Sequence, residues 1–120
     1  MLGTYIAAQQ DMQTPLQVTF RGFKHTPALD QFVRERAAEL EQVASNRMTS
    51  CHVVVDLGHE HAVPVFHARI DLAVPGGVIA VNQESHDLLP HEDAQIAVRN
   101  AFAIARRQLE SWEHRHHGES

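Results

Sequence analysis

Arginine is the residue of this sequence best suited to contacting a charged partner, because its planar guanidinium binds a phosphate as a fork and stacks on an unpaired base. Arg99, Arg106 and Arg107 lie close together near the end of the chain. The apolar residues around them recur at helical spacing, and the three arginines fall away from that stripe. The pattern predicts exposed guanidiniums one to two helical turns apart, a spacing that suits successive phosphates.

A second group of basic and imidazole side chains is predicted from strand alternation. Successive residues of a strand point to opposite faces of a sheet, so those that alternate with the apolar positions share the face away from the core. Side chains that could contact RNA lie on this face, at its rim and at the start of the last helix, and they are Arg21, Lys24, His25, His52, His67, Arg69 and His91.

Carboxylates give these charged residues a second interpretation. Glu110, Asp56 and Asp71 could balance the arginines and leave an ordinary solvated surface. Arg36 is a separate case, because it falls inside the apolar arc of the first predicted helix. An unpaired buried charge is costly, so this side chain is predicted to extend to the edge of the core or to pair with a carboxylate.

Histidines suggest metal binding only weakly. His59 and His61 flank Glu60, and three more crowd the C-terminus at positions 114, 116 and 117. Neither spacing is that of a closed metal site, and solvated histidines are the simpler interpretation. The expectation is therefore no resident metal.

The sequence gives little support for catalysis. Cys51 and His52 are neighbours on a predicted strand and would point to opposite faces, which prevents direct pairing of nucleophile and base. His91-Glu92-Asp93 contains acid and base groups, but it stands at a predicted helix start, where carboxylates stabilise the helix dipole. There is no glycine-rich phosphate loop, so neither an enzyme nor a cofactor is expected.

Length and charge limit the possible functions. The 120 residues, 43% of them apolar, suffice for one domain, and no apolar run approaches the roughly 20 residues that cross a bilayer. A single cysteine excludes an internal disulfide and favours a cytoplasmic location. The net charge is −5 with neutral histidines, so RNA binding would need a local basic patch. Ten histidines make this charge sensitive to pH, and protonation of His52, His67 and His91 is expected to tighten binding.

Two elements that could position these residues are predicted in the first half of the chain. Apolar and polar residues alternate from residue 16, which indicates a half-buried strand. Thr26-Pro27 marks a helix start, and helical spacing continues over 27–44. A β-branched run predicts a second strand over 51–57, followed by a histidine-containing loop over 58–64.

The second half of the chain adds a hairpin and a helix. Residues 66–72 alternate as a third strand, and the turn Val74-Pro75-Gly76-Gly77-Val78 joins it to a fourth strand over 78–84. A polar loop over 85–89 leads into an amphipathic helix over 92–113.

The order β-α-β-β-β-α predicts a two-layer α+β fold. A strand–helix–strand unit favours a parallel pair, and the two short connections that follow favour antiparallel neighbours. The four-stranded mixed sheet would carry both helices on one face and leave the other face open. We assign residues 1–14 to a flexible leader, 15–113 to the domain and 114–120 to a flexible His-rich tail.

Three segments carry a resemblance to a known family over about residues 16–112. They are Thr26-Pro27-Ala28-Leu29 with Arg36 and Leu40-Glu41, the Val74-Pro75-Gly76-Gly77-Val78 turn, and His91-Glu92-Asp93 followed by Arg107-Gln108-Leu109. In this order and spacing the sequence resembles the ribosome hibernation-promoting factors, also called protein Y, ribosome-associated inhibitors or sigma-54 modulation proteins. It looks like their short form, which lacks an added dimerisation domain.

The resemblance implies a fold and a function. Such proteins have the same β-α-β-β-β-α layers, occupy the mRNA and tRNA channel of the small ribosomal subunit, and silence idle ribosomes under stress. The chain is therefore expected to bind rRNA and inhibit translation, as a monomer off the ribosome, with no small-molecule substrate and no membrane partner. The alternative is a protein-interaction module of the same fold that no longer binds ribosomes, which the negative net charge favours.

Overall fold

The computed structural model describes residues 12–44, 47–60, 62–85 and 90–116, without the side chains of 90–92. Six elements follow one another along the chain, and the order confirms the predicted one. They are β1 (Leu16–Arg21), α2 (Pro27–Ala44), β2 (Ser50–Glu60), β3 (Val63–Val74), β4 (Gly77–Ser85) and α3 (Pro90–His116).

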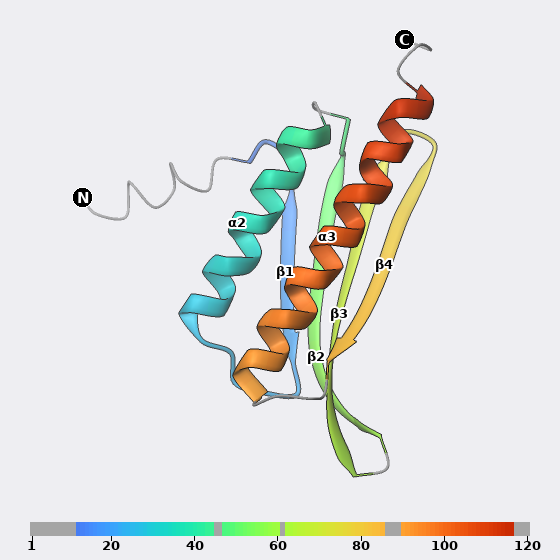
Figure 1. Ribbon diagram of the computed structural model, residues 1–120. Helices are drawn as coiled ribbons and strands as arrows, with labels where there is room; N and C mark the ends of the chain where they lie inside the picture. Colours follow the sequence, from blue (N-terminus) through green and yellow to red (C-terminus); the bar gives the residue numbers. More distant parts are fainter. Residues whose placement is uncertain (1–11, 45–46, 61, 86–89, 117–120) are drawn as a thin grey trace, which may run out of the picture.

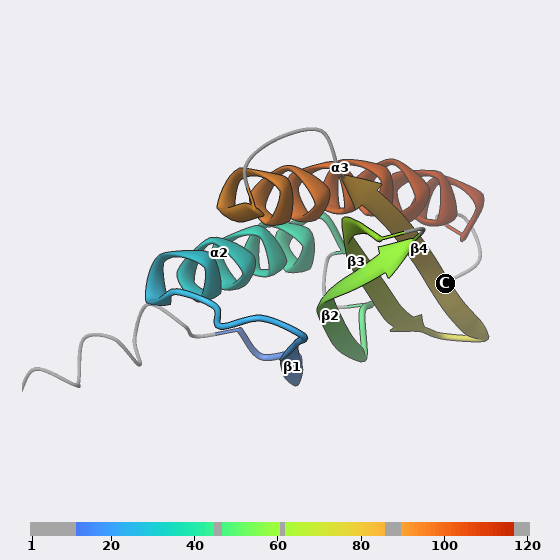
Figure 2. The same ribbon diagram turned by 90° about the horizontal axis from the view of Figure 1, so that it is seen from below.

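The four strands form one mixed sheet in the order β1-β2-β3-β4. β1 runs parallel to β2, whereas β2–β3 and β3–β4 are antiparallel pairs. Both helices cover the same face of the sheet, α2 near β1 and α3 over β3 and β4, as Figures 1 and 2 show. The two-layer α+β architecture predicted from the sequence is thus confirmed.

The core lies between the sheet and the two helices. On α2, Val33, Ala37 and Leu40 are buried at helical spacing. On α3, the buried stripe runs from Ala94 to Trp112, and small residues in it allow the helix to pack closely on the strands. These stripes fix which face of each helix remains for other contacts.

Local sequence explains where α2 begins. The Thr26 hydroxyl accepts a hydrogen bond from the Leu29 amide at 3.1 Å, which satisfies one of the free N–H groups of the first turn. Pro27 occupies the first helical position, where its missing N–H costs nothing. The predicted helix over 27–44 is therefore confirmed at both ends.

The connection from β1 to α2 depends on Gly22. This residue has φ of +84°, and a Cβ atom there would collide with the carbonyl oxygen of Leu57. Only glycine accepts both the left-handed backbone and the close approach of β2. The connection is therefore fixed against the sheet at this point.

The loop predicted over 58–64 is wrong. β2 continues to Glu60 and β3 begins at Val63, so the two strands form a long hairpin. β1 ends opposite Asp56 and β4 ends opposite Phe66, the partner of Leu57. The described residues beyond this point pair only with each other and extend past the sheet as a hairpin arm, residues 58–60 and 63–65 (Figure 1). Pro64 is tolerated because this part of β3 has no neighbour on its other side among the described strands.

The assignment of residues 1–14 to a leader and of 114–120 to a tail stays a prediction, and the structure describes part of each segment. Residues 1–11 of the leader lie outside the described residues, but Thr14 is buried and its hydroxyl donates to the Met48 carbonyl at 3.2 Å. α3 continues to His116, where the tail was expected to be flexible. The His116 ring stacks on Trp112 with centroids 4.4 Å apart, which stabilises this last turn. Residues 117–120 of the tail lie outside the described residues.

None of the helices in the described part of the chain is both long and apolar enough to span a bilayer.

Candidate nucleic-acid interface

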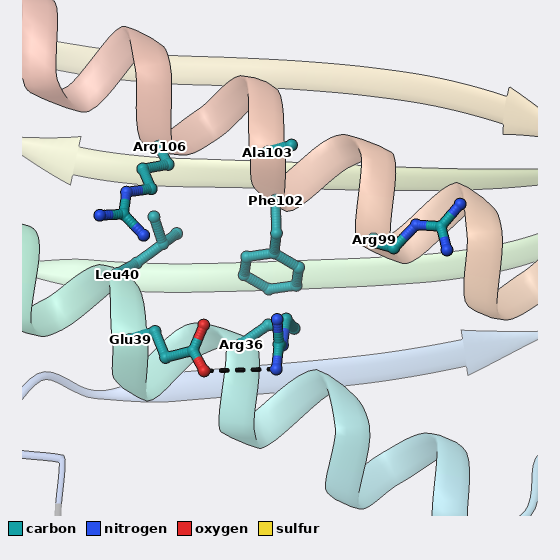
Figure 3. Close-up of a pocket in the computed structure, with 7 residues that line it drawn as sticks. All are labelled: Arg36, Glu39, Leu40, Arg99, Phe102, Ala103 and Arg106. Atoms are coloured by element: carbon teal, nitrogen blue, oxygen red, sulfur yellow. Dashed lines mark ion pairs between the residues drawn. The ribbon is translucent and has the colours of Figure 1, made fainter.

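A groove of about 210 Å³ runs between α2 and α3 on the surface of the helix layer. Three arginines reach it from two helices, Arg36 from α2 and Arg99 with Arg106 from α3 (Figure 3). The remaining lining residues are Glu39, Leu40, Phe102 and Ala103. We call these seven residues the arginine groove.

Helical spacing brings the α3 arginines to one side of their helix. Seven residues separate Arg99 from Arg106, which is close to two full turns. Between them the Phe102 ring projects from α3 toward α2 (Figure 3) and is buried at the floor of the groove. An apolar floor below several guanidiniums raises the strength of their interaction with an anion, because it lowers the local dielectric.

Arg36 lies at the α2 wall of the groove, at the edge of the core. Its Nη2 atom is 3.3 Å from Glu39 Oε2, and its guanidinium carbon is 5.2 Å from the centre of the Phe32 ring. Its buried Nε has no hydrogen-bond partner among the described residues. The predicted pairing with a carboxylate is therefore confirmed, and the pairing leaves one donor of this side chain unused.

The α3 arginines differ in how they are compensated. Arg106 Nε is 3.1 Å from Glu110 Oε2, so this guanidinium is already paired along the helix. Arg99 and Arg107 are exposed and form no ion pair with any described residue. Arg107 does not line the groove, because it lies about a quarter turn around α3 from Arg99. The groove and the adjacent surface of α3 therefore carry more positive than negative charge.

The open face of the sheet has a different charge pattern. Arg21 Nε is 3.6 Å from Asp56 Oδ1, and Arg69 Nε is 3.3 Å from Asp71 Oδ2. His67 lies beside Glu84, with 4.0 Å between Nδ1 and Oε2. Arg21 and Arg69 are thus paired with Asp56 and Asp71, two of the carboxylates that the sequence analysis named as possible partners of the arginines. We call the set Arg21, His52, Asp56, His67, Arg69, Asp71 and Glu84 the paired sheet face.

The structure does not bring the predicted RNA-binding residues together on one surface. Arg21, His52, His67 and Arg69 lie on the sheet face without helices, whereas Arg99, Arg106 and Arg107 lie on α3, which covers the opposite face. The His91 side chain lies outside the described residues. Sequence periodicity found the face of each element correctly, and helices on one side of the sheet already imply that these two faces point in opposite directions.

Lys24 and His25 occupy a third place. They line a cavity of about 520 Å³ at the N-terminal end of α2, whose other walls are mainly apolar. The His25 ring stacks on Phe20 with centroids 3.9 Å apart, and Phe23 packs edge-on against Phe66. These two basic residues are therefore next to an apolar hollow and outside both charged surfaces.

The Cys51 and Asp93 environments agree with structural roles. Cys51 is buried, and burial together with the charge of Asp71 raises its thiol pKa from 9.0 to about 12, so the thiol remains protonated at neutral pH. His52 follows on the opposite face of β2, where its Nε2 lies 3.3 Å from the Thr19 hydroxyl. Asp93 is buried and accepts a hydrogen bond from Ser85 at 2.8 Å, which joins the start of α3 to the end of β4.

Sequence reasoning missed the groove as a single site. It placed Arg99 and Arg106 on the exposed side of α3 and treated Arg36 only as a problem of burial. The missing information was how the two helices are placed side by side, which no local pattern specifies. The available signal was a pair of arginines seven residues apart on one helix and an arginine inside the apolar arc of the other.

Comparisons with known proteins agree with this fold. The family model described as Sigma 54 modulation protein / S30EA ribosomal protein matches residues 16–117. Two of the similar solved structures illustrate this. A ribosomal subunit interface protein from Coxiella burnetii has a TM-score of 0.64 and 17% identity, over 83% of this chain and 98% of that one. The Thermus thermophilus Protein Y N-terminal domain has a TM-score of 0.62 and 19% identity, over 82% of this chain and 99% of that one.

No curated protein sequence matches the chain. The structural likeness, at less than a fifth identity, concerns the fold. The family match shows the family as well as the fold. It extends from the first residue of β1 to one residue beyond α3. The chain belongs to the Sigma 54 modulation protein / S30EA ribosomal protein family.

Proposed function

We propose that this protein binds the small ribosomal subunit, occupies its mRNA and tRNA channel, and lowers translation under stress. Family membership supports the association with ribosomes. The similar structures include one described as a ribosomal subunit interface protein. The protein acts sterically in this proposal, without catalysis or cofactor, and it is a cytoplasmic monomer when it is not bound to a ribosome.

The observation that carries the proposal is the arginine groove. Arg36, Arg99 and Arg106 line it from two helices, around the buried Phe102 ring. Guanidiniums at this spacing can contact neighbouring phosphates of a folded rRNA strand. Each planar guanidinium can donate two parallel N–H hydrogen bonds to one phosphate. Arg107 adds a further exposed cation on α3 beside the groove.

The helix layer is favoured over the paired sheet face by charge. The sheet face holds two arginines against three carboxylates, and both arginines are in ion pairs. The three carboxylates of the sheet face would also repel an approaching phosphate, whereas the three arginines of the groove and Arg107 stand against Glu39 and Glu110 alone among the described ion pairs. Arg99 and Arg107 have no described ion pair to break. The proposed rRNA interface is therefore the arginine groove with Arg107, a smaller set than the sequence predicted.

The experiment compares matched double substitutions on the two faces. Arg99→Glu with Arg106→Glu is expected to reduce co-sedimentation with purified small ribosomal subunits by at least about tenfold, because two phosphate contacts become repulsive. Arg21→Glu with Arg69→Glu changes the charge equally on the paired sheet face and is expected to leave binding within about twofold. Circular dichroism verifies that both variants are folded.

The opposite ranking of the two variants would reject the groove as the interface. A wild-type protein that does not co-sediment would reject ribosome binding itself and support the protein-interaction alternative. Sucrose-gradient profiles of lysate from stationary cells give the same distinction for the protein in its cell.

A further inference from the structure

A cluster of three possible metal ligands lies at the end of the paired sheet face. Glu60, His67 and Glu84 each offer one ligand atom, and these atoms all lie within 4.8 Å of one another. They come from β2, β3 and β4, at the point where the hairpin arm extends past the sheet. We propose that these three side chains bind a divalent transition metal ion, with Zn²⁺ as the ion that best suits the ligands.

The separations require only a small movement to close around an ion. Zinc–nitrogen and zinc–oxygen bonds of about 2.0–2.2 Å in a tetrahedron place neighbouring ligand atoms about 3.4 Å apart. His67 Nδ1 and Glu84 Oε2 are already 4.0 Å apart. The His67 side chain is 29% exposed and Glu84 is 51% exposed, so the carboxylates can rotate toward a better fixed imidazole.

The ligand set selects the class of metal. One imidazole and two carboxylates suit Zn²⁺ or a neighbouring transition ion, whereas Ca²⁺ and Mg²⁺ prefer sites made of oxygen alone. Two carboxylates and a neutral imidazole balance the charge of a divalent cation. Three protein ligands leave a fourth position for water, as in open zinc sites.

The neighbouring charges do not oppose a cation at this place. Asp56 is the register partner of His67 on β2, and it is paired with Arg21. Arg69, two residues along β3 from His67, is paired with Asp71. Both guanidiniums near the cluster are therefore already compensated by other carboxylates, and Glu60 and Glu84 are left to the metal ion.

Metal binding would have a structural consequence that can be measured. Beyond Leu57 and Phe66, the strands of the hairpin arm pair only with each other among the described residues. Glu60 lies in that arm, whereas Glu84 belongs to the sheet. An ion shared by both would tie the arm to β4 and slow its local opening, because local stability rises with each added tertiary contact.

The test must separate this cluster from the histidines beside Glu60 and near the C-terminus. We therefore use the full chain with His59, His61, His114, His116 and His117 changed to Asn as the background protein. Isothermal titration with ZnCl₂ is expected to show one ion per chain. His67→Asn and Glu84→Gln in that background are each expected to weaken the affinity at least about tenfold, as loss of one of three ligands does. His52→Asn, a half-buried histidine of the same face, is the matched control and is expected to leave affinity unchanged.

Amide hydrogen exchange gives an independent readout. Zn²⁺ is expected to slow exchange in the hairpin arm of the background protein and to leave exchange in the Glu84→Gln variant unchanged. Absence of zinc binding by the background protein, or equal affinity in the His67→Asn and His52→Asn variants, would overturn the proposal. The site lies on the face opposite the arginine groove, so neither result depends on ribosome binding.

Discussion

At the scale of single residues, the surroundings of a reactive side chain decide whether it can act in catalysis or binding. Cys51, Arg36 and Asp93 all belong to types that often act in catalysis or binding. Burial raises the pKa of the Cys51 thiol, so the thiol stays protonated. The hydrogen bond from Ser85 to Asp93 joins the start of α3 to the end of β4. Arg36 is different, because its guanidinium reaches the groove while its Nε remains buried without a partner among the described residues.

The raised pKa of Cys51 predicts how stability changes with pH. The unfolded thiol ionises near 9.0 and the folded thiol near 12, so between these values the unfolded state has lost a proton that the folded state keeps. Stability from this group is complete below about pH 9 and falls above it, by up to about 1.4 kcal/mol per pH unit. Urea unfolding at about pH 8, 9 and 10 is expected to show a steeper loss for the wild type than for Cys51→Ala. Equal slopes would contradict this prediction.

At the scale of elements, the sequence predicted which segments are helices and which are strands, but it placed several of their first and last residues incorrectly. Periodicity placed both helices and the first and third strands, because alternation and helical stripes reflect which side of an element is buried. A β-branched run and a turn signal placed the second and fourth strands. The prediction failed where Gly58 and Pro64 indicated a loop, since those residues break a central strand but are accepted in a hairpin with free edges. It also ended α3 too early, because stacking of His116 on Trp112 is a contact that local propensity does not include.

Gly22 gives a prediction about the connection between β1 and α2. Gly22→Ala is expected to lower the free energy of unfolding by more than about 1 kcal/mol, because the residue has positive φ and its Cβ would meet the Leu57 carbonyl. Gly77→Ala is the control, since no heavy atom lies within 4 Å of a Cβ at that position. Its unfolding free energy is expected to stay within about 0.5 kcal/mol of wild type. Similar losses in both variants, measured by denaturant unfolding, would refute the role of Gly22.

At the scale of the whole molecule, a net charge of −5 hides an uneven distribution. The paired sheet face holds more carboxylates than arginines, while the arginine groove and Arg107 give the helix layer a local positive region. Composition could show only the total, and the predicted layers placed exposed residues on two sides without showing which arginines are paired with carboxylates. The separation into two unlike faces follows from both helices packing on one side of the sheet.

This separation predicts the salt dependence of ribosome binding. The affinity for small subunits is expected to fall linearly with salt on logarithmic axes, because each phosphate contact releases counterions. The slope is expected to decrease by roughly two in the Arg99→Ala, Arg106→Ala double variant, which removes two such contacts. Filter binding between about 50 and about 200 mM salt measures this slope. An unchanged slope would mean that these side chains do not contact phosphate.

The paired sheet face and the arginine groove lie on opposite sides of the molecule, and this placement affects how ligands on the two sides influence each other. The sheet and the helix layer stand between them, and none of the described ion pairs joins a residue of one face to a residue of the other. Substitutions on the two sides should therefore add in their energetic effects, as they do for distant, unconnected positions. Under the two proposals, a nucleic acid lying along the helices would leave the paired sheet face accessible to a metal ion.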